Sequence, residues 1–195
     1  MDATIGLRVR SGWSAAVVVA GSPGKPEVHL STTVLQSDPE VPETKQPYHH
    51  GINTLEDDEE AISSRVAIVE RETRAAIDKL IEETKSTGLA ITTAGIVVGS
   101  IIEPERITNP HIRAHAFEGR VFWKSIEKAL HAHQISSIVI LEKSAYQRAA
   151  AALSCTEEEV TKIASLFGTK FRPWRAEQKL STMGALVAMA ELQSK

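Results

Sequence analysis

The chain has 195 residues, of which 42% are hydrophobic and 24% charged, and its formal net charge is −3. This composition excludes disordered and fibrous proteins, and the weak acidity argues against a protein that holds nucleic acid mainly through phosphate contacts. The early apolar run at residues 15–20 is too short for a signal peptide or membrane span, and the one cysteine, Cys155, excludes an intramolecular disulfide. We therefore expect a single cytoplasmic domain over residues 1–195.

The first part of the chain is rich in strand-forming residues. Residues 3–10 and 13–20, separated by a Ser-Gly turn, predict a β-hairpin, and the alternating residues 27–36 predict a third antiparallel strand. A proline-containing loop follows over residues 37–54. Loops of this length inside a compact domain are either functional or poorly ordered.

A long amphipathic helix is predicted over residues 55–87. Thr54 is its expected N-cap, acidic residues fill its first turn, and Gly88 is the expected residue just past its end. A helix of this length favours a partner helix, so we expect a homodimer through the 55–87 helix. Its apolar stripe consists of Ile62, Val66, Val69, Thr73, Ala76, Leu80 and Thr84.

Two segments rich in β-branched residues, 89–102 and 136–142, predict strands buried on both faces. Between them, Asn109 as N-cap and Pro110 at the first helical position predict the start of another helix. The expected buried stripe of this helix is Ile112, Ala116, Gly119, Phe122, Ile126 and Leu130.

Three further helices are expected over residues 144–153, 156–168 and 174–192, the second beginning with a capping box from Thr156 to Glu159. Three antiparallel strands followed by strands that alternate with helices predict an α/β fold. We expect a mixed five-stranded sheet with helices on both faces.

Residues 109–135, 138–160 and 174–190 resemble segments of the RuvC-type Holliday-junction resolvases, which have the ribonuclease-H-like fold. The likeness lies in an Asn-led helix, in a strand that ends in Glu before a helix of small residues, and in a closing Ala/Leu-rich helix. The resemblance implies a ribonuclease-H-like fold. In that family, about four carboxylates hold two divalent metal ions that activate water and stabilise the leaving oxygen.

The resemblance places few carboxylates where the family needs them. The aspartate position of the first strand falls on Arg8, and the acidic position of the fourth strand falls near Gly99, several residues before Glu103. The acidic pair of the closing helix falls on Trp174 and Glu177. A guanidinium repels a metal ion, so Arg8 is interpreted as either bridging the remaining carboxylates or binding an anion.

Three functions are therefore considered. The leading interpretation is a non-catalytic binding or assembly protein, a pseudo-enzyme with a lost two-metal site and no cofactor. The second is a divergent structure-specific nuclease with Mg²⁺ or Mn²⁺ held by Glu103, Glu142 and Glu177. The third is an anion- or nucleotide-binding protein that uses Arg8 together with Arg175 and Lys179.

The histidines form a separate set of candidate binding residues. His111, His115 and Glu118 share a helix face, and their spacing could bind Zn²⁺. The simpler interpretation is a helical first turn whose histidines bond backbone or solvent, and no metal ligand is assigned. His49, in the loop sequence KQPYHHG, could act as a general base or lie in a surface loop pinned by Tyr48.

Overall fold

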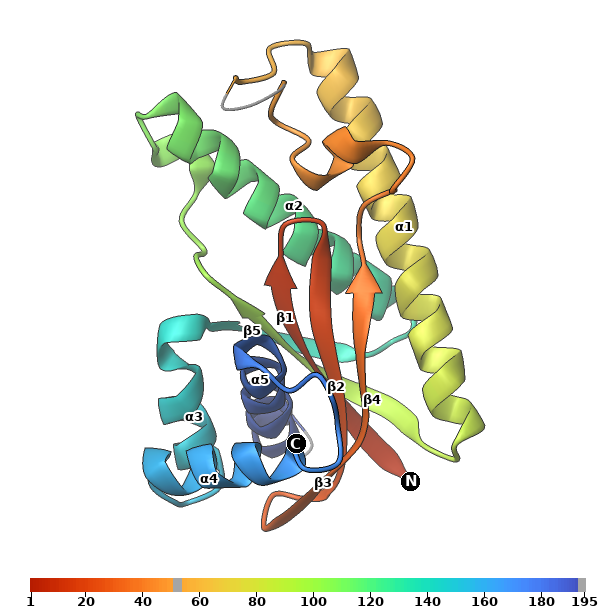
Figure 1. Cartoon of the computed structure of the whole chain (residues 1–195), viewed down its shortest axis with the longest axis vertical. Coiled ribbons are helices and arrows are strands. Elements are labelled where there is room, and N and C mark those ends of the chain that lie inside the picture. Colours follow the sequence, from red (N-terminus) through yellow and green to blue (C-terminus); the bar gives the residue numbers. More distant parts are fainter. Residues whose placement is uncertain (51–53, 193–195) are drawn as a thin grey trace.

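The computed structural model describes residues 1–50 and 54–192, and its centre is a five-stranded sheet in the order β3-β2-β1-β4-β5 (Figure 1). The pairs β1–β2 and β2–β3 are antiparallel, whereas β1–β4 and β4–β5 are parallel. This confirms the predicted mixed α/β sheet. The strands are β1 (Asp2–Arg10), β2 (Trp13–Ser22), β3 (Lys25–Leu35), β4 (Ala90–Val98) and β5 (Ser136–Leu141).

Helices cover both faces of the sheet, as Figure 1 shows. The helices α1 (Glu59–Ser86) and α2 (Pro110–Ala132) pack against one face and against each other. The other face carries α3 (Ala145–Ala152), α4 (Glu157–Phe167) and α5 (Ala176–Leu192). Each helical layer encloses its own apolar core, which is why β2 is buried on both faces. Three short 3-10 segments join these elements: η1 (Pro42–Lys45), η2 (Pro104–Arg106) and η3 (Glu142–Ser144).

Alternation along β1 decides which side chains meet which helical layer. Ile5 and Leu7 enter the core under α1 and α2, whereas Gly6 and Arg8 face α5. The contact with α5 is close enough to exclude a side chain, since a Cβ placed on Gly6 would lie 1.7 Å from the Ser181 carbonyl oxygen. The backbone of α5 therefore rests directly on β1.

The predicted start of α1 is wrong. Its N-cap is Asp58, whose carboxylate accepts from the backbone N–H groups of Glu60 and Ala61, and not Thr54. The reason is that Leu55 is held in an isolated β-bridge with His49, so the chain before Asp58 stays extended. The predicted end is confirmed, because Gly88 follows the helix with a φ of +82°.

The predicted stripe of α2 is wrong in its first turns. Ile112 is 55% exposed and Gly119 is also exposed, while Ala114 and Glu118 are buried in their place. This part of α2 lies beyond the sheet and packs on the loop that carries His49, so its buried side is partly polar. The Asn109 cap is confirmed, since its side chain accepts from the Ile112 N–H.

Two predicted strands are shorter or less buried than expected. β4 ends at Val98 rather than at residue 102, and the chain then leaves the sheet toward η2. β5 is an edge strand, and within it only Ile140 is fully buried. The capping box of α4 is confirmed, with Thr156 and Glu159 bonded reciprocally.

The loop predicted over residues 37–54 contains η1, which is anchored by the buried Thr44. Residues 51–53 of that loop lie outside the described residues. The buried residues of α1 pack within the chain itself, so the homodimer through the 55–87 helix stays a prediction. Among the described residues, no helix has the length and apolar character needed to cross a membrane.

Candidate functional site

Arg8 lies at the carboxyl end of β1, in the face covered by α5. Its side chain is 4% exposed, and its backbone N–H donates to the Ser181 hydroxyl at 3.1 Å. Nη1 donates to the Val9 carbonyl at 2.7 Å, and Nη2 pairs with the carboxylate of Glu142, just past β5. The buried Nε finds no hydrogen-bond acceptor among the described residues. The guanidinium thus joins the ends of two strands.

Charge and burial act against each other at this arginine. Burial lowers the pKa of the Arg8 guanidinium, while the Glu142 carboxylate raises it. Arg10 lowers that pKa further and Glu177 raises it, because both charges lie nearby. Since arginine keeps its proton at any physiological pH, Arg8 holds a permanent positive charge here.

A second ion pair lies beside the first. Arg10 donates to the Glu177 carboxylate at 3.2 Å, linking the end of β1 to the first turn of α5. Arg8, Arg10, Glu142 and Glu177 are called the arginine cluster from here on. The structure therefore brings together three of the residues proposed from the sequence, Arg8, Glu142 and Glu177.

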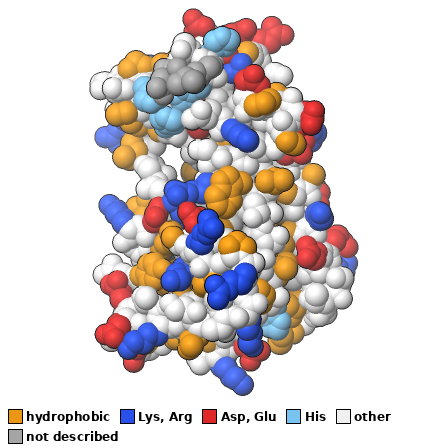
Figure 2. All heavy atoms as spheres, viewed as in Figure 1, with side chains coloured by type: hydrophobic (Ala, Val, Ile, Leu, Met, Phe, Trp, Pro, Cys, Tyr) orange, Lys and Arg blue, Asp and Glu red, His pale blue; other side chains and the backbone are white. Residues whose placement is uncertain are grey.

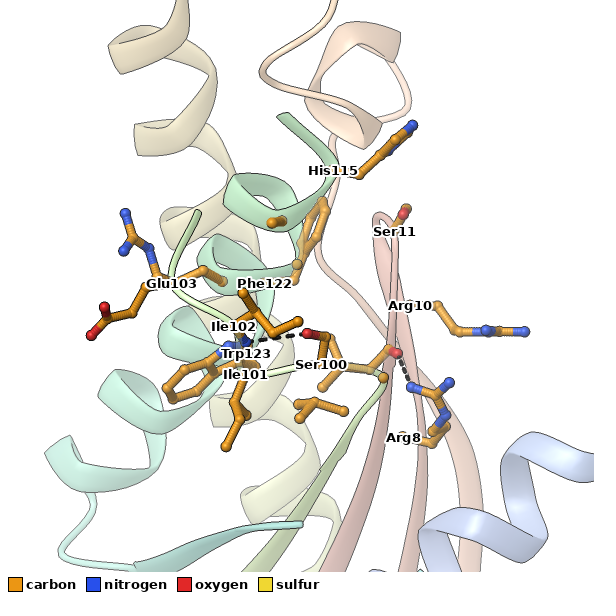
Figure 3. Close-up of a pocket in the computed structure, with 16 residues that line it drawn as sticks. Arg8, Arg10, Ser11, Ser100, Ile101, Ile102, Glu103, His115, Phe122 and Trp123 are labelled. Atoms are coloured by element: carbon orange, nitrogen blue, oxygen red, sulfur yellow. Dashed lines mark hydrogen bonds between the residues drawn. The ribbon is translucent and has the colours of Figure 1, made fainter. Parts of the chain in front are cut away.

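Glu103 does not join them. It precedes η2 and is exposed, and Figure 3 shows it on the opposite side of the pocket from Arg8. Arg175 and Lys179 are absent from the described residues that line this pocket. Arg175 is exposed, and its backbone N–H donates to the side chain of Gln178.

The pocket in Figure 3 is a cleft of about 500 Å³ between the ends of β1 and β4 and the helix α2. Arg8 and Arg10 line it from the strands, and Arg120 lines it from α2. Arg120 is itself held by two bonds to Glu105, at 2.7 and 3.1 Å. The apolar lining of the cleft includes Ile101, Ile102, Phe122 and Trp123. Figure 2 shows Lys and Arg side chains gathered around the middle of one face of the molecule.

His49, His111 and His115 form a second polar cluster, although His49 lies more than sixty positions before the other two. The His49 Nε2 atom is 3.4 Å from His111 Nδ1, and the His115 Nε2 atom is 3.3 Å from His111 Nε2. Glu118, which is 1% exposed, bonds Nδ1 of His49 at 2.7 Å and Nδ1 of His115 at 3.1 Å. These four residues are called the histidine cluster.

The loop that carries His49 is fixed on both sides. The Tyr48 N–H also donates to Glu118, and the Tyr48 ring stacks on Phe117 with a centroid distance of 5.0 Å. Arg65 of α1 donates to the His49 carbonyl at 3.1 Å. Tyr48 does pin the loop as the sequence suggested, but His49 is buried rather than on the surface.

The sequence did not indicate several of these residues. Arg10 and Arg120 look like ordinary surface cations in sequence, since nothing local marks the cleft that they line. The sequence did indicate that Glu118 lies near His111 and His115, because the three residues share a helix face. Nothing in the sequence indicated that His49 lies beside these residues, because its position depends on the path of a loop.

The comparisons with known proteins concern the fold alone. No family model matches the chain, and no curated protein matches it. The structure is similar to that of Thermus thermophilus RuvC, with a TM-score of 0.54, 13% identity, and coverage of 95% of this chain and 92% of that one. The structure is also similar to that of T. thermophilus RuvC in complex with a Holliday junction substrate, with a TM-score of 0.55 and 12% identity. The match covers 96% of this chain and 92% of that one. The chain therefore has a ribonuclease-H-like fold similar to that of RuvC.

Proposed function

We propose that this chain is a non-catalytic RuvC-like protein that binds an anionic ligand in the cleft, and that the arginine cluster stands where the nuclease would hold its metals. The observation that carries the proposal is the ion pair between Arg8 and Glu142. It puts a guanidinium, already paired with a carboxylate, at the end of β1, where the resemblance expects an aspartate.

The carboxylates available as metal ligands near Arg8 support the loss of the two-metal site. Two hard divalent cations need several carboxylate oxygens around them. At this end of the sheet, Glu142 is paired with Arg8 and Glu177 with Arg10, while Glu103 lines the opposite side of the cleft. A guanidinium has no lone pair to offer a metal and repels it. These residues do not fit a two-metal centre.

The lining of the cleft supports an anionic ligand with a flat apolar part, such as a nucleotide. Arg10 is 47% exposed on its side chain and only loosely paired, so its guanidinium can turn toward a phosphate. The Arg8 Nε–H is buried and meets no acceptor among the residues that the structure describes. Phe122 and Trp123 add aromatic surface close to these cations.

The loss of nuclease activity is tested by incubating the chain with a four-way DNA junction and an RNA–DNA hybrid in Mg²⁺ and in Mn²⁺. We expect no cleavage above a no-protein control. Metal-dependent cleavage that disappears in Glu142→Gln and in Glu177→Gln would instead establish the divergent nuclease.

Ligand binding is tested by thermal unfolding against a panel of nucleotides and inorganic phosphate. A ligand at 100 times its Kd stabilises the folded state by about 2.7 kcal/mol, which raises the midpoint measurably. We expect the shift to be lost in Arg10→Ala and kept in Lys179→Ala, since Lys179 lies outside the cleft lining. Loss in Lys179→Ala alone would move the anion site to the start of α5, and no shift at all would end the proposal.

A further inference from the structure

The histidine cluster has the composition and spacing of a metal site. A metal ion bound tetrahedrally by imidazole at 2.0–2.1 Å keeps any two ligand nitrogens about 3.3 Å apart. His111 lies between the other two rings, with its Nδ1 3.4 Å from His49 Nε2 and its Nε2 3.3 Å from His115 Nε2. A single ion takes one nitrogen from each ring, and one such set lies within 4.8 Å of one another. Imidazole groups suit Zn²⁺, a borderline-soft cation.

Glu118 fixes which nitrogen each ring offers. A buried carboxylate only accepts hydrogen bonds, so His49 and His115 donate to it from Nδ1. In neutral rings this leaves both Nε2 atoms with a free lone pair. A carboxylate behind a ligating histidine is the usual means by which proteins orient and strengthen such ligands.

If all three rings are neutral, they cannot supply a proton for each of the two short nitrogen contacts. Both Nε2 lone pairs face His111, one toward its Nδ1 and the other toward its Nε2. A neutral His111 carries a single N–H and can satisfy only one of them. The other pair would place two lone pairs against each other at hydrogen-bond distance, which is repulsive. A cation removes this conflict, whether it is a second proton on His111 or a metal ion among the three rings.

The site is also accessible and rigidly held. His49 is buried, His111 is half-buried, and the His115 side chain is 44% exposed, so an ion can enter from the α2 side. The backbone around His49 is fixed by Glu118 and Arg65. Figure 2 shows histidine side chains gathered on the surface at one end of the molecule. A preformed ligand set of this kind loses little entropy when the ion binds.

We propose that His49, His111 and His115 bind one Zn²⁺ ion, with Glu118 as the positioning residue behind two of the ligands. Three protein ligands leave a fourth coordination position open, as in zinc sites that hold water or a substrate group. His115 also lines the cleft, where Figure 3 labels it above Ser11, so the open position lies beside the cleft. The zinc site does not depend on the proposed loss of nuclease activity.

The test uses the full chain without a polyhistidine tag, stripped of metal by a chelator and titrated with Zn²⁺ by calorimetry. Co²⁺ is the spectroscopic probe, since four-coordinate Co²⁺ has intense visible absorption. We expect one ion per chain and a four-coordinate Co²⁺ spectrum. His111→Ala should lose both. His131→Ala is the matched control, because His131 is an exposed histidine on the same helix and outside the cluster.

Glu118→Gln separates positioning from folding. The amide offers an N–H toward one ring and forces that ring to carry its own proton on Nε2, so we expect Zn²⁺ affinity to fall about 10- to 100-fold. Circular dichroism confirms that this variant is folded, and His115→Gln serves as a second ligand variant at an exposed position. Absence of stoichiometric binding in the wild type, or equal binding by His111→Ala, would refute the zinc site.

Discussion

The arginine cluster and the histidine cluster border the same cleft, but different groups face their carboxylates. In the arginine cluster, two guanidinium groups of the protein neutralise the carboxylates of Glu142 and Glu177. In the histidine cluster, Glu118 bonds His49 and His115, and no arginine or lysine is among the four residues. The comparison teaches that a guanidinium fixed to the chain repels a metal ion, whereas imidazole rings can bind one, as we propose for Zn²⁺.

The largest effect should come from Gly6→Ala, which perturbs the arginine cluster through the backbone. The new Cβ would clash with the Ser181 carbonyl and push α5 away from Arg8. We expect a loss of about 3 kcal/mol in the free energy of unfolding, measured by urea titration. Zinc binding by the folded fraction should persist, because the hydrogen bonds that join the histidine cluster run between the His49 loop and α2 and do not involve α5. A loss below about 0.5 kcal/mol would show that α5 can shift freely.

Arg8→Met tests the ion pair itself. Removal of a charged hydrogen-bond partner costs about 1.5–3 kcal/mol, and the 44% exposure of Glu142 favours the lower end because water can solvate the orphaned carboxylate. Chemical unfolding of Arg8→Met, Glu142→Gln and the double variant gives the coupling energy. Additive losses would mean that the pair contributes nothing to stability.

Asn109→Ala addresses the other cluster. Asn109 caps the first turn of α2, which carries His111, through its bond to the Ile112 N–H. We expect about 1 kcal/mol of destabilisation in thermal unfolding, together with weaker Zn²⁺ binding as that turn frays. Ligand binding at Arg10 should be unchanged. An equal loss in both sites would argue that α2 responds as one rigid unit.

The smallest effect concerns Asp78 and His133, an exposed pair that joins α1 and α2 far from both clusters along α2. The hydrogen bond from His133 holds the pKa of Asp78 below its usual 3.8. A lowered carboxyl pKa stabilises the fold above pH 3.8, and that contribution disappears as the pH falls through the lowered value. Asp78→Asn should cost less than about 1 kcal/mol at neutral pH and flatten the acid limb of the stability profile. An unchanged acid limb would remove Asp78 as its source.

The sequence predicted what local chemistry determines. The Asn109 cap, the Gly88 end and the capping box at Thr156 depend on neighbours within four residues, and all three are confirmed. The mixed five-stranded sheet follows from the run of strands and helices, because few topologies connect them without crossings. Thr54 failed as a cap because a bridge between His49 and Leu55 keeps the chain extended as far as Asp58.

The candidate sites were less predictable because they join distant segments. The convergence of Arg8, Glu142 and Glu177 followed from the resemblance, since strand ends meet at one edge of the sheet. The histidine cluster needed two facts that no local pattern carries. The first is the path of the loop that brings His49 to α2, and the second is that Ile112 faces solvent while Glu118 is buried.

The direct contact of α5 with the sheet has a consequence for how the chain reaches its fold. The N–H of Arg8 and the hydroxyl of Ser181 are 173 positions apart, yet they bond beneath the same helix. Pairings this distant in sequence must close a large loop first, and they slow folding. Until α5 docks, that helix does not cover the Gly6 side of β1, and the arginine cluster lacks Glu177.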